Sequence, residues 1–80
     1  LRSECSVERV NWVAGAPPTS AIEATVKIRY RDPGAAAKVF ASPDGSARVE
    51  FVEPRRAITP GQAAVFYDSN RVLGGGWIAR

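Results

Sequence analysis

Three cations recur at alternate positions in one short stretch, Lys27, Arg29 and Arg31. Because successive side chains of a β-strand point to opposite faces, these three would share one face at intervals of ~6.6–6.8 Å. That interval is close to the spacing of phosphates along one nucleic-acid strand. Lys38, Arg55 and Arg56 could extend the row. The pattern indicates a polyanion-binding surface, while a solvated outer face balanced by acids on neighbouring strands explains the same residues.

The sequence offers few groups for catalysis or metal binding. Histidine is absent and Cys5 is the only cysteine, which excludes an internal disulfide, Cys/His zinc sites and imidazole-based nucleophilic catalysis. Gly74–Gly76 lacks the Lys-Ser/Thr that follows in a phosphate-binding loop. Glu50 and Glu53 are better explained as salt-bridge partners than as an acid–base pair. We therefore predict a binding domain with no catalytic residue, metal or cofactor of its own, and Cys5 as a small strand side chain.

Length and charge narrow the class of protein. The 80 residues suit one domain, 1–80, and eleven Lys and Arg against eight acids give a net charge of +3. This moderate excess permits a polyanionic partner. No apolar run approaches the ~20 residues that span a bilayer, and no signal peptide is visible, so we expect no membrane partner and a cytoplasmic location. The chain starts at Leu1 and holds no Met, which suggests a domain excised from a longer protein.

Alternating apolar residues predict the strand that carries the three cations. From Ile22 to Arg31 the apolar residues fall on one face and the charged residues on the other. Ala35–Ala41 could be a helix by propensity, but its end reads as the first arm of a hairpin turning at Asp44-Gly45. With this arm, six strands are expected: Ser3–Val13 with an irregularity near Arg9-Val10, Ile22–Arg31, Lys38–Ala41, Ser46–Val52 ending at Pro54, Ala63–Tyr67 in a central position, and Arg71–Ile78.

Six short strands with turns every 8–12 residues indicate an all-β domain, either a small antiparallel barrel or a sandwich. A barrel is favoured because closure leaves no exposed strand edge. Gly74–Gly76 predicts a bulge or a close approach of another backbone. Trp12, Tyr30 and Trp77 could stack on bases, but core positions are favoured in a domain this small.

Several runs together resemble the C-terminal domain of the bacterial tRNA-specific 2-thiouridylases. Each run would be weak evidence alone, but they occur in order and cover most of the chain from Val10 to Ile78. Asp32 departs from the family pattern, which usually has Gln there, and it places an acid beside the cations. The runs are VNWV at 10–13, ATVKIRYR at 24–31, VEFVEP at 49–54, AITPGQAAVFY at 57–67 and VLGGGWI at 72–78.

The resemblance implies a fold and a role. It implies a closed six-stranded barrel, similar to the second-domain barrels of translational GTPases, that helps to hold tRNA. The family enzyme makes 2-thiouridine at the wobble position, using ATP and a cysteine persulfide. Its PP-loop motif and both catalytic cysteines belong to an N-terminal domain, so Cys5 is not one of them and the N-terminal domain becomes an expected partner.

Two other functions stay open from the residues. The chain could be a barrel from a translation factor, which a GTPase domain upstream would reveal in place of a PP-loop domain. It could also dock on its own catalytic domain without touching RNA, and exposed apolar residues such as Trp12 or Trp77 would then mark the docking face.

Overall fold

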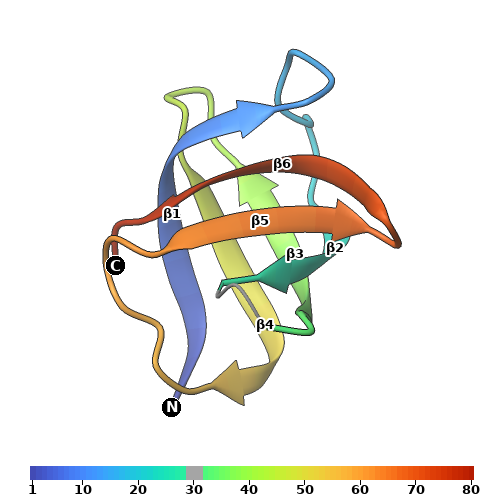
Figure 1. The fold of residues 1–80 in the computed structure, drawn as a ribbon. Helices are drawn as coiled ribbons and strands as arrows, with labels where there is room; N and C mark the ends of the chain where they lie inside the picture. Colours follow the sequence, from blue (N-terminus) through green and yellow to red (C-terminus); the bar gives the residue numbers. More distant parts are fainter. Residues whose placement is uncertain (29–31) are drawn as a thin grey trace.

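The computed structural model describes residues 1–28 and 32–80. Within them the chain forms six β-strands and no helix (Figure 1). No helix able to cross a membrane is therefore found in this part of the chain. The strands are β1 (Arg2–Trp12), β2 (Ile22–Lys27), β3 (Ala35–Ala41), β4 (Ala47–Arg55), β5 (Ala63–Asp68) and β6 (Arg71–Ile78).

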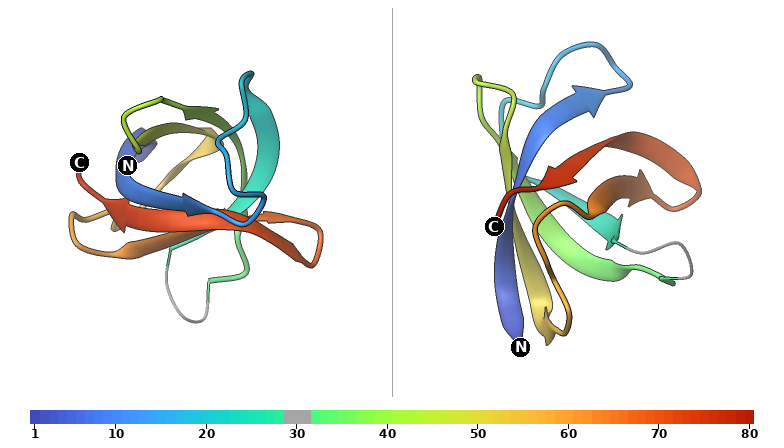
Figure 2. Two further views of the ribbon diagram at one scale, coloured as in Figure 1. Left: turned by 90° about the horizontal axis from the view of Figure 1, so that it is seen from above. Right: turned by 60° about the vertical axis from the view of Figure 1, so that its left-hand side comes forward.

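The strands close into one antiparallel barrel, which confirms the predicted fold. Their order around the barrel is β1-β4-β3-β2-β5-β6, and β6 pairs with β1 to close it. Figure 2, seen from above, shows the strands as a ring around a central space that side chains fill. Each strand has a neighbour on both sides, so closure satisfies the edges that a small open sheet would expose. β5 accordingly lies between β2 and β6, as its apolar sequence predicted.

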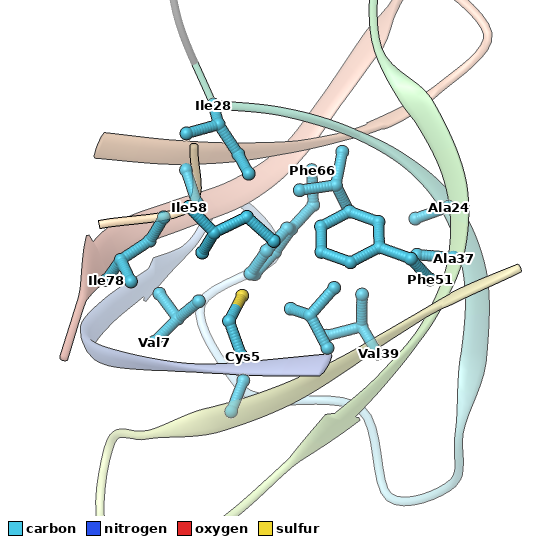
Figure 3. Packing of buried hydrophobic residues seen from close by; sticks show 14 residues of the cluster. Cys5, Val7, Ala24, Ile28, Ala37, Val39, Phe51, Ile58, Phe66 and Ile78 are labelled. Atoms are coloured by element: carbon cyan, nitrogen blue, oxygen red, sulfur yellow. The ribbon is translucent and has the colours of Figure 1, made fainter. Parts of the chain in front are cut away.

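The core follows from alternation along the strands. Val26 is fully buried and Ala24 and Ile28 are nearly so, while Glu23 is exposed and Thr25 and Lys27 are half-buried. The predicted inward face of this strand is therefore confirmed up to Ile28. Every strand adds inward residues, and Ile58 closes the core from the segment between β4 and β5 (Figure 3). The fully buried side chains of largest volume are Phe66, Ile78, Val7, Val26, Val39, Val49 and Cys5.

Two predicted irregularities are present. The register between β1 and β6 shifts between Glu8 and Asn11, where Arg9 has a φ of 52°. This shift is the break expected near Arg9-Val10. The glycine run on β6 lies against neighbouring backbones: a Cβ on Gly75 would come within 2.6 Å of the Ala64 carbonyl oxygen, and one on Gly76 within 2.5 Å of the Glu8 carbonyl oxygen. The glycines are therefore needed for close approach, as predicted.

The hairpin predicted at Asp44-Gly45 joins β3 to β4. Gly45 has a φ of 91°, and the Asp44 carboxylate accepts hydrogen bonds from the backbone N–H and the hydroxyl of Ser46. Its first arm, β3, is a strand over Ala35–Ala41, which confirms the hairpin over the helical alternative. Pairing of β3 with β4 runs from Ala41 opposite Ala47 to Ala37 opposite Phe51.

The predicted stop at Pro54 is wrong. β4 continues to Arg55, which aligns with Arg2 of β1. Pro54 falls within a register shift, since Arg2 pairs with Arg55 but Glu4 already pairs with Glu50. A proline lacks an N–H to donate, and a position without an aligned partner loses nothing by that absence. At the other predicted boundary, β2 ends at Lys27, and the expected continuation over 29–31 lies outside the described residues.

Candidate nucleic-acid interface

Lys27 stands at the end of β2 with its side chain on the outer face of the barrel. Its ammonium lies over the ring of Tyr67, 4.7 Å from the centroid. Its stem passes Gly34, where an added Cβ would come within 3.2 Å of Lys27 Cγ. The aromatic face and the glycine thus hold the stem while the charged end stays at the surface. Lys27 is well placed to meet an anion.

Arg55 lies near the same end of the barrel but is engaged by the protein. Its guanidinium forms a two-pronged ion pair with Asp32, with 2.9 Å from Nη2 to Oδ1 and 2.9 Å from Nη1 to Oδ2. Nη1 also lies 3.5 Å from the Val26 carbonyl oxygen, and the guanidinium carbon is 5.6 Å from the Phe51 ring centroid. The side chain is 19% exposed. The Asp32 carboxylate balances the charge of Arg55, so Arg55 has mainly a structural role and adds little net positive charge to the surface.

Asp32 links residues near the end of β2 and the start of β3 to β4. Its side chain is 4% exposed, and its oxygens accept hydrogen bonds from the backbone N–H groups of Ile28 and Gly34 as well as from Arg55. Burial alone would raise the pKa of Asp32. The hydrogen bonds from Arg55, Ile28 and Gly34 and the Arg55 charge outweigh burial and lower that pKa to about 2. Asp32 therefore ties Ile28 and Gly34, which lie on either side of 29–31, to Arg55 of β4.

Lys38 lies apart from Lys27. It is exposed on β3, directly opposite Glu23 of β2 on one side and Glu50 of β4 on the other. In the register of β2 and β3, Lys27 is four residues from the Lys38 partner, or ~13 Å along the strand. A shallow hollow of about 380 Å³ borders Lys38 and Tyr67. The acids beside Lys38 weaken its field, as the solvated-face interpretation predicted for neighbouring strands.

The remaining predicted cations are only partly placed. Arg29 and Arg31 lie outside the described residues. Arg56 follows β4 directly and is exposed. The structure thus brings Lys27 and Arg55 to one end of the barrel and places Lys38 elsewhere. The role of all six residues in RNA binding stays a prediction.

The sequence reasoning missed a second surface group, around Trp77. Trp77 is 44% exposed on β6, and the guanidinium carbon of Arg9 lies 5.8 Å from its ring centroid. Trp12, by contrast, packs against the core with its ring 5.5 Å from that of Phe66. The core position favoured for both tryptophans is therefore right for Trp12 and wrong for Trp77. Alternation from the apolar Ile78 would have placed Trp77 on the outer face.

Nothing in the described part of the chain resembles a reactive centre. Cys5 is 1% exposed, and burial raises the pKa of its thiol, against the smaller opposing effect of Arg2. A buried thiol of raised pKa is a poor nucleophile. Residues 1–28 and 32–80 also hold no group of three or more metal-ligating acids, cysteines or histidines.

Comparison with known proteins identifies the relatives of this barrel. The family model described as the aminomethyltransferase β-barrel domain matches residues 2–78. Proteins named tRNA-specific 2-thiouridylase MnmA are similar over nearly the whole chain: 49% identical over 96% of it in Magnetococcus marinus, 49% over 99% in a Synechococcus strain, and 51% over 96% in a Nostoc strain. The chain spans 22% of the length of each of these three relatives.

Proposed function

Since the chain belongs to the aminomethyltransferase β-barrel domain family, in the form found as the C-terminal domain of the tRNA-specific 2-thiouridylases, we propose that it helps such an enzyme to hold its tRNA. The observation that carries the proposal is the match over residues 2–78, with about half of the residues identical to those of 2-thiouridylases. The proposed reaction of the whole enzyme is 2-thiolation of the wobble uridine. The similarity to 2-thiouridylases also favours this proposal over the alternative that the chain is a barrel from a translation factor.

In this proposal the chemistry takes place outside the barrel. ATP activation and sulfur delivery belong to the PP-loop domain, and the barrel contributes no catalytic group or cofactor. The geometry supports such a division, because Cys5 is buried in the core and the charged side chains lie on the outer wall. The barrel would act by contacting the tRNA backbone and so by orienting the uridine toward the catalytic domain.

The end of the barrel that carries Lys27 is the best candidate for phosphate contact. Lys27 is held over Tyr67 with its ammonium at the surface. Asp32 accepts a hydrogen bond from the Ile28 N–H and pairs with Arg55, so the Arg55 charge is balanced within the protein while Lys27 stays available to a ligand. Together with Arg29 and Arg31, which continue the alternating pattern in the sequence, Lys27 would meet successive phosphates.

A salt titration tests this role directly. Phosphate contacts release counterions, so the slope of log K against log salt falls by roughly 0.7–0.9 for each contact that is lost. Binding of bulk tRNA to the 80-residue chain should weaken steeply with salt, and K27A/R29A/R31A should reduce both affinity and slope. A matched variant, R48A/R71A/R80A, removes the same charge from other parts of the wall. Equal slopes for both variants would contradict phosphate contact by the predicted row.

Docking on the rest of the enzyme is a second candidate function, favoured by one observation. Val52 is 73% exposed on β4, next to the exposed Ala36 of β3, and together they form an apolar spot beside a hollow of about 270 Å³. An apolar spot on a small domain is typical of a protein contact. Substituting Val52 with Asp should weaken association with a separately produced PP-loop domain, measured by sedimentation, and should leave tRNA binding unchanged.

A further inference from the structure

A groove runs over the outer faces of β1, β5 and β6. It has a volume of about 260 Å³. We call it the Trp77 groove; Trp77 and Arg9 lie at one end, Asn11 and Val65 form its sides, and Gly75 forms its floor. In the strand register Asn11 and Val65 both pair with Gly75, from opposite sides. None of the six cations predicted to bind RNA lines this groove.

The floor of the groove is free of side chains for a structural reason. A Cβ on Gly75 would meet the Ala64 carbonyl oxygen at 2.6 Å, so no larger residue fits this close approach of β5 and β6. The consequence is a strip of half-exposed backbone between an amide side chain and an aliphatic one. Such a strip leaves room for a planar group beside the Trp77 ring.

Arg9 reaches the groove through the bulge in β1. Its φ of 52° is unfavourable for a residue with a side chain. Bulges redirect side chains, and here the guanidinium comes to lie over the Trp77 ring, with Glu8 3.9 Å away. The Arg9 side chain is 72% exposed. An exposed Arg–Trp pair beside an exposed Asn is rich in donors and keeps an aromatic surface in solvent.

We propose that the Trp77 groove binds an unpaired nucleobase of RNA. The base would stack on Trp77, with Arg9 and Asn11 hydrogen-bonding to its edge, since proteins recognise unpaired bases by aromatic and guanidinium stacking combined with polar contacts to base edges. This inference rests on the proposed tRNA-holding function and adds a contact that does not depend on phosphate. The Arg9 guanidinium and the Asn11 amide favour a base over an apolar protein segment, because the cores of protein interfaces are depleted of charge.

Fluorescence of Trp77 provides the first test. Single-stranded oligouridylate added to the 80-residue chain should quench tryptophan emission, because stacking brings a base against the exposed indole. The variant W77F keeps an aromatic ring and leaves Trp12, which packs on Phe66, as the remaining tryptophan. W77F should bind within a few-fold of the parent chain but lose the quenching. Full quenching in W77F would place the base elsewhere and overturn the proposal.

Affinity and salt dependence provide the second test. W77A should weaken oligouridylate binding about tenfold, as expected for loss of one stacked base, and should leave the salt slope unchanged. V72A, which truncates another exposed apolar residue of β6 outside the groove, is the matched control and should bind like the parent chain. R9G relieves the positive φ and removes the guanidinium, so it should weaken binding while the fold stays intact.

The outcomes separate this inference from the proposed function. If K27A/R29A/R31A lowers the slope for tRNA but W77A binds both RNAs normally, the tRNA-holding role stands and the Trp77 groove is not a base site. If neither RNA binds at low salt, the tRNA-holding role fails, and the groove proposal fails with it. If W77A instead loses association with the PP-loop domain and keeps RNA binding, the groove is a protein contact and the proposal is overturned.

Discussion

Arg55 and Arg9 occupy contrasting regions of the same barrel wall. Arg55 belongs to the predicted basic row, yet it is 19% exposed and held by Asp32 through both prongs of its guanidinium. Arg9 was not among the predicted binding residues, yet it is 72% exposed, lies over Trp77, and pairs only loosely with Glu8 at 3.9 Å. One arginine neutralises a buried carboxylate, and the other faces solvent at the cost of a strained backbone.

This difference shows that the distance of a cation from a basic run in the sequence does not predict whether its charge is available to a ligand. A buried carboxylate needs a partner, and Arg55 is the cation that the fold brings to Asp32 from 23 residues away. At Arg9 the bulge directs the side chain outward, where the exposed carboxylate of Glu8 pairs with it only weakly. The ligand-facing charges of this barrel are therefore decided by the acids that pack beside each cation.

The largest expected effect follows from removing the Arg55 charge. R55M keeps an apolar stem over Phe51 and leaves the Asp32 carboxylate buried without its cation. Breaking such a pair should lower the free energy of unfolding by about 3 kcal/mol, measured by urea denaturation. R48M, which breaks an exposed pair with Glu50, should cost less than about 1 kcal/mol. Equal losses in the two variants would remove the distinction between buried and exposed arginines, and D32N/R55M should recover part of the loss.

The next largest effect is expected at acid pH, which should lower the free energy of unfolding through protonation of Asp32. The pKa of Asp32 is about 2 in the fold against an ordinary value of 3.8. A lowered pKa stabilises the fold at pH values above the ordinary one, and that contribution, about 2 kcal/mol, is lost as the pH falls from about 5 toward 2. Urea unfolding at pH 7, 4 and 2 should show this loss, and D32N should reduce it. D44N is the matched control, since Asp44 also has a lowered pKa but is exposed. An unchanged acid profile in D32N would contradict the role of this carboxylate.

Substitution of Arg9 should change the free energy of unfolding in the opposite direction from substitution of Arg55. R9G relieves a φ of 52° and loses only an exposed ion pair, so the free energy of unfolding should rise by up to about 1 kcal/mol. Thermal unfolding measures the change, and S69G, at another non-glycine residue with a positive φ of 55°, should behave similarly. A clear destabilisation by R9G would show that the Arg9–Trp77 contact supports the fold, and the contrast with Arg55 would disappear.

The smallest effect is expected at Lys38. K38A removes a cation that lies between Glu23 and Glu50 on the outer face, and cross-strand charge pairs contribute about 0.2–1 kcal/mol. The free energy of unfolding should therefore change by less than about 1 kcal/mol. A loss as large as that of R55M would mean that the outer face also depends on its ion pairs, and chemical denaturation of both variants side by side decides this.

Much of the fold could be predicted because alternation is local. The inward residues of β2 and β4 and the hairpin at Asp44-Gly45 are consequences of neighbours in the chain. The glycine run on β6 predicted a close approach by residue type alone, and the fold supplies the β5 and β1 backbones that approach it. The stop at Pro54 could not be predicted correctly, because whether a proline loses a hydrogen bond depends on the register of β1. The exposure of Trp77 was missed for a different reason. Its large apolar side chain suggested a core position, although the alternation around it places it outside.

The sequence by itself determined that this chain is a small all-β domain with one amphipathic basic strand, and that it has no histidine and one cysteine, because these properties depend on residue types and a period of two. The tertiary structure decided which charges remain for a ligand. Asp32 meets Arg55, and Arg9 meets Trp77, only when the barrel closes and brings separate strands together. Pairing between distant strands is set by register, and register is a property of the closed barrel.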